Sequence, residues 1–488
     1  MNKIFSGKYF LYLQIAFFLT LFFVTRNDPF FGDAIASTSG CVNTIYDQNL
    51  GTFFYPVDAD PAHPTLYSWF MALSWKIFGR TLYISHLYGI IWLMVLVSVF
   101  RKIAKIFLYD IESVNKATLL LFVMPVFLAQ GAMMLNTVAV MTFFLAAIYG
   151  LIKKNKAGFL IGSTLMMIAH LQGAFFLLAL ASADLFFALK EKKSLLQFVK
   201  ERFLFYFIPL LVFGIWLFLH YRHTGWLIQS PNYTDADEWN SPVQFIKSVF
   251  IMIWRLIDFG MLPFYMIFIF IFFKNTGDKK LQQLWLILTV VICSFMAVFL
   301  SKTIGHRYFL ALGMLMIIIV MNALRYFKTN QKNLLFYILL TSLTAGNFLY
   351  YPGKNIGDGT LAYRNYFPIE KQIKKDFGNS AFFYSYTPIA NPSELMYLDD
   401  SGLKTKRIDR QELDSLPAII QSNLNAEFSE DDKQFLEKNF YGKSYENGVV
   451  YVNVFLNPKY YSKPEGWKLR EPSQFEKWMI GVKAKLKN

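Results

Sequence analysis

The chain has 488 residues, of which 55% are hydrophobic and only 17% are charged, whereas a typical soluble protein carries about 25% charged residues. The net charge of +15 would suit a nucleic-acid partner. However, the basic residues form short clusters between long apolar runs, which argues against nucleic acid and is typical of a membrane protein. The apolar excess ends near residue 350, and the remainder has the composition of an ordinary polar domain.

Apolar runs suited to crossing a bilayer, which takes about 20 residues, follow one another through the first 350 residues. The first run has a basic start but no small-residue cleavage site after it, so we interpret it as a retained span and not a signal peptide. We expect a polytopic α-helical membrane domain over residues 1–350. The eleven candidate spans are 9–25, 82–107, 115–130, 132–152, 157–173, 174–190, 203–220, 246–273, 281–301, 307–325 and 333–350.

The basic clusters predict the orientation of these spans. With the N-terminus in the cytoplasm, the inner loops hold "KKNK" (153–156) and "KEKK" (190–193), whereas the outer loops hold few basic residues. This is the positive-inside pattern. It predicts that the loop 26–81 and the tail from about 351 share the outer, periplasmic side of a bacterial inner membrane.

The first outer loop, 26–81, is acidic and aromatic. Its segment 64–79 is apolar on much of its circumference but only about 16 residues long, which suits a helix lying in the interface. We expect Tyr67, Trp69 and Trp75 at headgroup level. Such a loop would hold carboxylates against a membrane-bound substrate. Its acids are Asp28, Asp33, Asp47, Asp58 and Asp60.

The tail, 351–488, predicts a small soluble α/β or α+β domain on the outer face. Segments 380–386, 417–422 and 448–456 have the pattern of strands. Segment 391–402 begins like a helix, and 429–440 has a Ser cap followed by acids, which favour a helix N-terminus. The chain contains no glycine loop of the nucleotide-binding kinds, which weakens functions that need ATP or a nucleotide sugar.

Three short stretches carry a family resemblance: "FFGDAIASTSG" (30–40), "HPTLYSW" (63–69) with "IFG" (77–79), and "GHRYFLAL" (305–312). In this order and topology they resemble the GT-C class of integral membrane glycosyltransferases, with the closest likeness to the protein O-mannosyltransferase and lipid A aminoarabinose transferase group. The resemblance identifies Asp33 with the catalytic acid after the first span, and Arg307 and Tyr308 with a late Arg-Tyr motif. Ala34, Thr65 and Asn136 depart from the group's pattern, which leaves the sugar and the acceptor open.

The resemblance implies an inverting transfer of a sugar from a polyprenyl-phosphate donor to a hydroxyl of a protein, lipid or glycan, on the outer face. An acceptor hydroxyl needs a general base, and Asp33 would supply it. The leaving phosphate needs positive charge, and we expect Arg307, with His306 or His63, to hold it. Further candidates for substrate contact are Asp58, Asp60, Tyr67, Tyr308 and Arg255.

Structural roles remain open for several of these residues. Asp33 would also serve as the N-cap of a helix beginning at Ala34, and Arg307 would also reach headgroups. Asp58, Asp60 and His63 supply ligands for a divalent metal, although a solvated turn is the favoured interpretation, and we expect no cofactor. His170 and Gln172, near the join of the fifth and sixth spans, would line the outer cavity or satisfy a broken backbone. Arg255 and Asp258, three residues apart within one span, would form a structural ion pair or bind the donor.

Two other functions compete with the transferase. One is a transporter or flippase of lipid-linked sugars, with the acids lining a path. The other is a glycan polymerase or ligase that uses a lipid-pyrophosphate donor. The transferase should release polyprenyl phosphate, need no ion gradient and fail when Asp33 alone is changed. The number of phosphates in the donor separates it from a polymerase or ligase.

Overall fold

The structure is a computed structural model, which describes residues 5, 7–32, 34–55, 57, 60, 63–228, 242–272, 278–299, 305–348, 359–379, 381–385, 403–407, 410–424, 429–474 and 477. Two predicted site residues, Asp33 and Asp58, lie outside the described residues, as does the helix start predicted at 391–402.

Each predicted span coincides with a helix or with two helices joined at a bend. By length and composition alone, and within the described part of the chain, four helices can cross a membrane, or six if each bent pair is one span. The count of eleven stays a prediction. The helices are α1 (Lys8–Thr25), α4 (Leu82–Phe107), α5 (Ile111–Val123), α6 (Pro125–Ala132), α7 (Thr137–Ile152), α8 (Lys156–Met167), α9 (Gln172–Lys190), α10 (Leu195–Thr224), α11 (Pro242–Ile257), α12 (Leu262–Phe272), α13 (Lys279–Phe299), α14 (Leu310–Ala323) and α15 (Thr329–Gly346).

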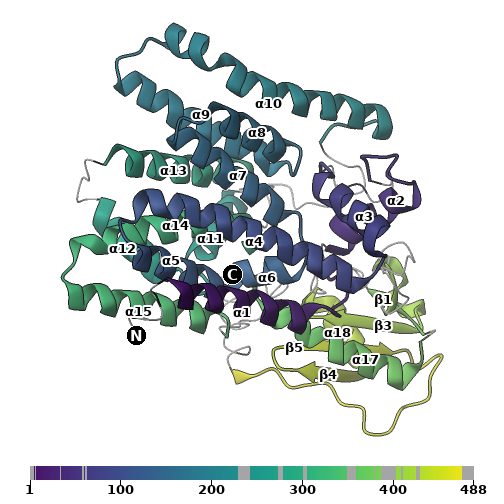
Figure 1. Cartoon of the computed structure of the whole chain (residues 1–488). Coiled ribbons are helices and arrows are strands. Elements are labelled where there is room, and N and C mark those ends of the chain that lie inside the picture. Colours follow the sequence, from purple (N-terminus) through teal and green to yellow (C-terminus); the bar gives the residue numbers. More distant parts are fainter. Residues whose placement is uncertain are drawn as a thin grey trace.

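The helices form a bundle around α14 (Figure 1), in which all residues of α14 are buried. It packs against α4, α5, α12 and α13. Two predicted spans are broken. α5 and α6 meet at 64°, where Met124 is extended and Pro125 begins α6, because a residue before proline avoids the helical region. α11 and α12 meet at 93°.

The loop 26–81 folds into a π-helix (Ile35–Gly40), α2 (Cys41–Asp47) and α3 (Leu66–Phe78). α3 confirms the predicted helix, but the expectation that Tyr67 and Trp75 lie at headgroup level is wrong. Both are 1% exposed. Tyr67 packs against aromatic rings of α4, and the indole N–H of Trp75 donates to Ser85 Oγ at 2.9 Å. α3 packs its aromatics on α4 because there they bury more apolar area than at a headgroup; its exposed face is Phe70, Ile77 and Phe78 instead.

The C-terminal domain contains a five-stranded mixed sheet of order β2-β1-β3-β5-β4. β1 is parallel to β2 and β3, whereas β5 is antiparallel to β3 and β4. β1, β3, β5 and the Ser-capped α18 confirm predictions; the Asp432 N–H donates to Ser429 Oγ. The elements are η6 (Leu361–Asn365), α17 (Tyr366–Phe377), β1 (Phe382–Ser385), β2 (Lys404–Arg407), η7 (Arg410–Ser415), β3 (Ala418–Ser422), α18 (Glu430–Asn439), β4 (Tyr441–Asn447) and β5 (Val450–Leu456).

The C-terminal domain and the loop 26–81 meet at one end of the bundle, as predicted (Figure 1). Arg364 of η6 donates to both carboxylate oxygens of Asp28, at 2.5 and 3.2 Å, and to the carbonyl of Val24. Phe31 stacks on Tyr363 beside this ion pair. Burial raises the pKa of Asp28, and the hydrogen bond and charge of Arg364 offset part of that effect. A carboxylate in such a place needs its cation to stay charged.

Candidate functional site

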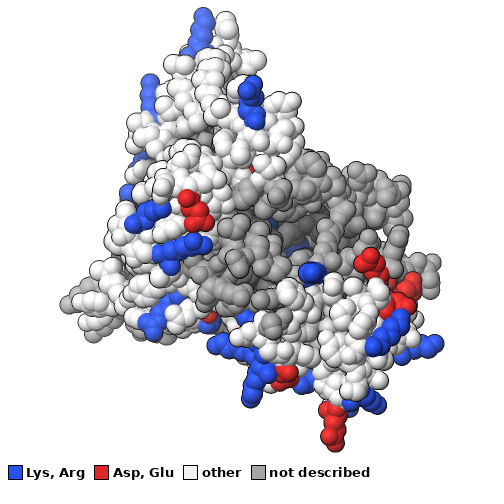
Figure 2. All heavy atoms as spheres, turned by 90° about the vertical axis from the view of Figure 1, so that its right-hand side faces the viewer, with Lys and Arg blue, Asp and Glu red and all other residues white. Residues whose placement is uncertain are grey.

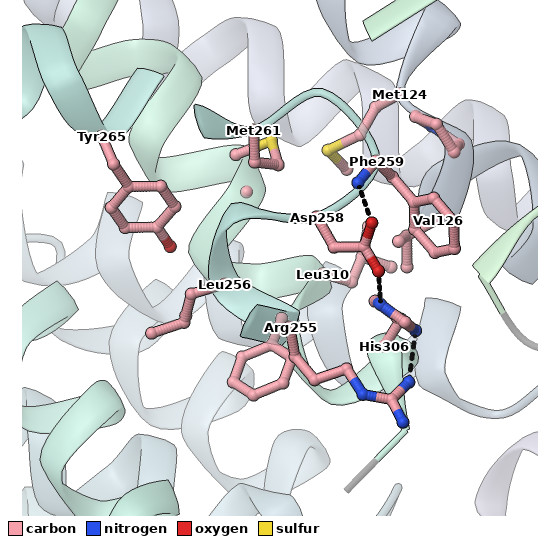
Figure 3. A pocket seen from close by; sticks show the side chains of 13 residues that line it. Met124, Val126, Arg255, Leu256, Asp258, Phe259, Met261, Tyr265, His306 and Leu310 are labelled. Atoms are coloured by element: carbon pink, nitrogen blue, oxygen red, sulfur yellow. Dashed lines mark hydrogen bonds and ion pairs between the residues drawn. The ribbon is translucent and has the colours of Figure 1, made fainter. Parts of the chain in front are cut away.

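A buried polar network lies at the bend between α11 and α12. The imidazole of His306 sits between Arg255 and Asp258 (Figure 3), with its Nδ1 2.8 Å from Arg255 Nη1 and its Nε2 2.8 Å from Asp258 Oδ2. The other oxygen of Asp258 accepts the backbone N–H of Phe259 at 2.7 Å. The two charges of the eighth span are thus linked through a residue of η4 (His306–Phe309) that is 48 positions away from Asp258.

The hydrogen-bond partners of His306 define which of its ring nitrogens carries the proton. Arginine can only donate, so His306 Nδ1 accepts and carries no proton. The remaining proton lies on Nε2, which donates to Asp258. His306 is then neutral, and the network as a whole balances one guanidinium against one carboxylate. All three side chains are nearly buried, where such pairing is needed to offset desolvation.

The turn that carries Asp258 is held tightly against α15. Phe259 and Gly260 have positive φ angles of 49° and 84°. A Cβ on Gly260 would lie 2.1 Å from the carbonyl oxygen of Ser342, whose hydroxyl donates to the Gly260 carbonyl. Only glycine fits both conditions. Next to the turn lies a cavity of about 30 Å³, with room for a water molecule.

A second group of basic side chains gathers beside this network. The rings of His63 and His170 have centroids 4.1 Å apart, and Arg307 lies close enough for its charge to act on His170. His170 Nδ1 accepts the backbone N–H of Gln172 at 3.1 Å, which places its proton on Nε2. The structure therefore brings together His63 from the loop, His170 from the α8–α9 turn, and Arg307.

Adjacent residues of η4 thus face two different sets of partners. His306 joins the network at the bend, whereas the charge of Arg307 acts on His170 and its guanidinium lies 5.1 Å from the ring of Tyr308. Figure 2 looks onto this end of the molecule: the surface is hollowed near the middle of the view, and Lys or Arg atoms are visible inside the hollow. Asp33 lies outside the described residues.

Asp60 is fully buried and pairs with a residue that the sequence did not single out. Its Oδ2 is 2.9 Å from Nε2 of His220, near the C-terminal end of α10. The imidazole is stacked on Trp216 and meets Trp226 edge-on. Within the described residues, Nδ1 of His220 has no hydrogen-bond partner. This pair fastens the loop 26–81 to α10.

The predicted set Asp58, Asp60 and His63 is only partly described. Asp60 bonds His220 and His63 packs on His170, so these two side chains have different neighbours. Within the described residues, no group of three His, Cys, Asp or Glu side chains could hold a metal ion. Tyr67 lies apart from both basic groups, against α4, and its hydroxyl is buried without a partner among the described residues.

The fold is that of a polytopic membrane protein in which the loop 26–81 and the C-terminal domain meet at one end of the helix bundle. Two solved structures share it. The structure of ArnT from Cupriavidus metallidurans bound to undecaprenyl phosphate has a TM-score of 0.55 and 10% sequence identity, and the match covers 92% of this chain and 98% of that chain. The structure of the same protein in the apo state has a TM-score of 0.54 and 11% sequence identity, and the match covers 91% of this chain and 97% of that chain. ArnT is a lipid A aminoarabinose transferase of the GT-C class. No family model matches the chain, and neither does any curated protein.

Proposed function

We propose that this protein is a membrane glycosyltransferase of the GT-C type, which moves a sugar from a polyprenyl-phosphate donor to an acceptor hydroxyl. The observation that carries the proposal is the ArnT-like fold over nine-tenths of the chain. One of the two ArnT structures holds undecaprenyl phosphate, the lipid that such a donor leaves behind. Arg307 supplies the charge that a lipid phosphate requires, and the imidazoles of His63 and His170 lie near it as polar neighbours.

The chemistry divides between a base and an anion site. Asp33 takes the proton of the acceptor hydroxyl as that oxygen attacks the anomeric carbon. The bond to the donor phosphate breaks, and the leaving phosphate gains charge. Arg307 stabilises that charge, because its fork of N–H donors matches phosphate oxygens. Attack from the face opposite the leaving group inverts the anomeric centre.

The network at the bend serves this site by positioning. His306 is held on both sides, by Arg255 and Asp258, and it directly precedes Arg307 in η4. Holding one residue of a short 3-10 segment fixes the direction of the next. In this proposal Arg255 positions Arg307 through His306. Arg255 would also contact the donor phosphate directly if that phosphate binds within reach of its guanidinium.

The proposal places the reaction on the periplasmic side of a bacterial inner membrane, with the N-terminus in the cytoplasm. The positive-inside pattern supports this orientation. The C-terminal domain, docked through Arg364 and Asp28, then stands over the site, where an acceptor protein, lipid or glycan would arrive.

A detergent assay separates this function from its competitors. The purified protein is incubated with polyprenyl-phosphate sugars and an acceptor extract from the native envelope, and the lipid products are measured by mass spectrometry. A transferase releases polyprenyl phosphate without any ion gradient. An intact donor in every condition would favour a flippase, and consumption of only lipid-pyrophosphate donors would favour a polymerase or ligase.

A further inference from the structure

A second cavity lies at the opposite end of the bundle from the loop 26–81 and the sheet. It has a volume of about 250 Å³ and is formed by the α4–α5 turn, the end of α14 and the start of α15. In Figure 1 these helix ends lie on the far side of the molecule from β1 to β5. The cavity takes no part in the proposed transfer. We call it the basic cavity, after the Lys116, Arg325 and Lys332 side chains that line it.

The charges of the basic cavity leave an excess of one positive charge, since its three basic side chains face two acids, Asp110 and Glu112. Both acids have local partners. Asp110 accepts the N–H and hydroxyl of Ser113, and Glu112 pairs with Lys116 at 2.7 Å.

The two other cations differ in how they are held. Arg325 donates to the hydroxyls of Tyr109 and Tyr326, each at 2.6 Å. These neutral partners orient the guanidinium without cancelling its charge. Lys332 has no ionic or hydrogen-bonding partner for its ammonium within the described residues. The cavity therefore presents a fixed and a movable cation to an anion.

The floor of the basic cavity is apolar and carries one buried acceptor. Phe107, Met321 and Phe336 line it and are at most 5% exposed. Asn322, 2% exposed, also lines it. Its Nδ2 donates to the carbonyl of Phe107, and its Oδ1 has no partner among the described residues. A buried acceptor without a donor is unfavourable, so a ligand with a hydroxyl group would be stabilised here.

The surroundings of the basic cavity are those of a membrane surface. Tyr109 is 74% exposed, and tyrosines are enriched where headgroups meet the protein. On α15, Leu334 and Ile338 are exposed as well, so the helix beside the cavity presents apolar side chains outward. The positive-inside pattern predicts that this end faces the cytoplasm, where the leaflet is anionic.

We propose that the basic cavity binds the headgroup of an anionic phospholipid that carries free hydroxyls, such as phosphatidylglycerol. Arg325 and Lys332 contact the phosphate, a headgroup hydroxyl donates to Asn322 Oδ1, and the glycerol and first acyl carbons lie on the apolar floor. Basic pockets between helices on the cytoplasmic side recognise anionic lipids in this way. The site would hold the protein at the inner leaflet, apart from the reaction.

Native mass spectrometry of the purified chain tests the proposal. The chain is titrated with phosphatidylglycerol, with phosphatidylcholine and with water-soluble glycerol phosphate, and bound adducts are counted. Phosphatidylglycerol should bind tightest. The double variant Arg325→Gln, Lys332→Gln should weaken it about 30-fold, from about fivefold per basic residue at a membrane surface. The matched control is Lys153→Gln with Lys190→Gln, two exposed residues at helix ends outside the cavity, which should bind like the unchanged chain.

Equal binding of phosphatidylglycerol by the double variant and the control would overturn the proposal. Equal retention of phosphatidylcholine and phosphatidylglycerol would also overturn it, because the site would then not select charge. Tight binding of glycerol phosphate alone would do the same, because the ligand would then be a soluble phosphate. If the double variant does not fold, Lys332→Glu alone replaces it, since that ammonium contacts no described partner. It should weaken phosphatidylglycerol at least fivefold.

Discussion

Sequence and structure together support the role of Arg307 in the proposed anion site more directly than that of any other described residue. Its place in "GHRYF" predicts that it holds the donor phosphate, and the structure adds His63 and His170 near it. The sequence named all three residues, but their grouping depends on contacts between segments more than 100 residues apart. Spacing along one helix or strand cannot predict such contacts, which is why His63 and His306 remained alternatives as partners of Arg307.

Arg307→Gln should raise the KM for the polyprenyl-phosphate donor by about 10- to 100-fold, because a hydrogen bond to a charged group contributes about 1.5–3 kcal/mol. Arg307→Lys should recover part of the loss, since it keeps the charge without the fork of donors. Steady-state kinetics measure both. Arg222→Gln, an exposed basic residue in the last turn of α10, serves as the control. A KM for Arg307→Gln equal to that of the control would remove Arg307 from the anion site.

Other residue contacts could not be read from the sequence. Asp258 was identified as a neighbour of Arg255 on one helix, yet His306 bridges the two. His220 drew no attention, because a lone histidine at the end of a long apolar helix is more often structural. Its pairing with Asp60 joins positions 160 residues apart. The sequence shows that Asp60 lies in a loop but not that it is buried, and it is the burial of a carboxylate that requires a partner.

At the scale of elements, the bend between α11 and α12 decides the shape of the site. The apolar run 246–273 predicted one continuous span, and the structure breaks it at residues 258–261. The charges of Arg255 and Asp258 were visible in the sequence, but the break depends on the fit of Gly260 against Ser342 of α15. The pattern of apolar residues does not report such a fit. It does predict elements whose own residues show a clear local pattern, such as β5 and α18.

Gly260→Ala should lower the free energy of unfolding by about 2 kcal/mol or more, because it adds a Cβ at a left-handed residue that contacts backbone. It should also reduce transfer activity by displacing Asp258. Gly214→Ala is the matched control, since a Cβ there has nothing within 4 Å in the middle of α10. Thermal unfolding in detergent compares the two variants. Equal midpoints would show that the bend tolerates a side chain.

Two strands of the C-terminal domain, β2 and β4, escaped prediction for physical reasons. β2 reads "KTKR", which has no apolar alternation. It is the edge strand of the sheet, where lysines discourage pairing with other chains. β4 is largely half-buried and its pattern is too polar for a strand prediction. It is defined by its hairpin with β5, for which the "ENG" turn was the only sign.

At the scale of the whole molecule, the C-terminal domain docks through an ion pair of mixed exposure that lies beside the stacked rings of Phe31 and Tyr363. Arg364 is 31% exposed and Asp28 12% exposed as side chains. The topology predicted that the two segments share one end, and the contact over 336 residues confirms this. The identity of the pair was not predictable, because neither residue belongs to a recognised motif.

Arg364→Gln should destabilise the docked state by about 2 kcal/mol at pH 7, and by less at pH 5. Burial raises the pKa of folded Asp28 above its ordinary value of 3.8. The folded state therefore binds the proton more readily, and the contribution of Asp28 to stability falls as pH rises through the raised pKa. Removing Arg364 raises the pKa of folded Asp28 further, so the loss of stability caused by Arg364→Gln grows as the pH rises. Thermal unfolding at the two pH values measures the effect.

Lys459→Gln is the control for this experiment. It removes an ion pair with Asp414 in the same domain, in which both side chains are more than half exposed, and such pairs contribute little. The docking role would be contradicted if the loss of stability caused by Arg364→Gln became smaller between pH 5 and pH 7. It would also be contradicted if that loss equalled the loss caused by Lys459→Gln.

In our proposal the chain transfers a lipid-linked sugar with Asp33 as base. Lipids and glycans are compared by mass spectrometry between cells that express the unchanged chain and cells that express a correctly inserted Asp33→Asn variant at the same level. We expect a glycosylated product that is present only with the unchanged chain, together with accumulation of the polyprenyl-phosphate sugar in the variant. Identical lipid and glycan profiles in the two strains would contradict it.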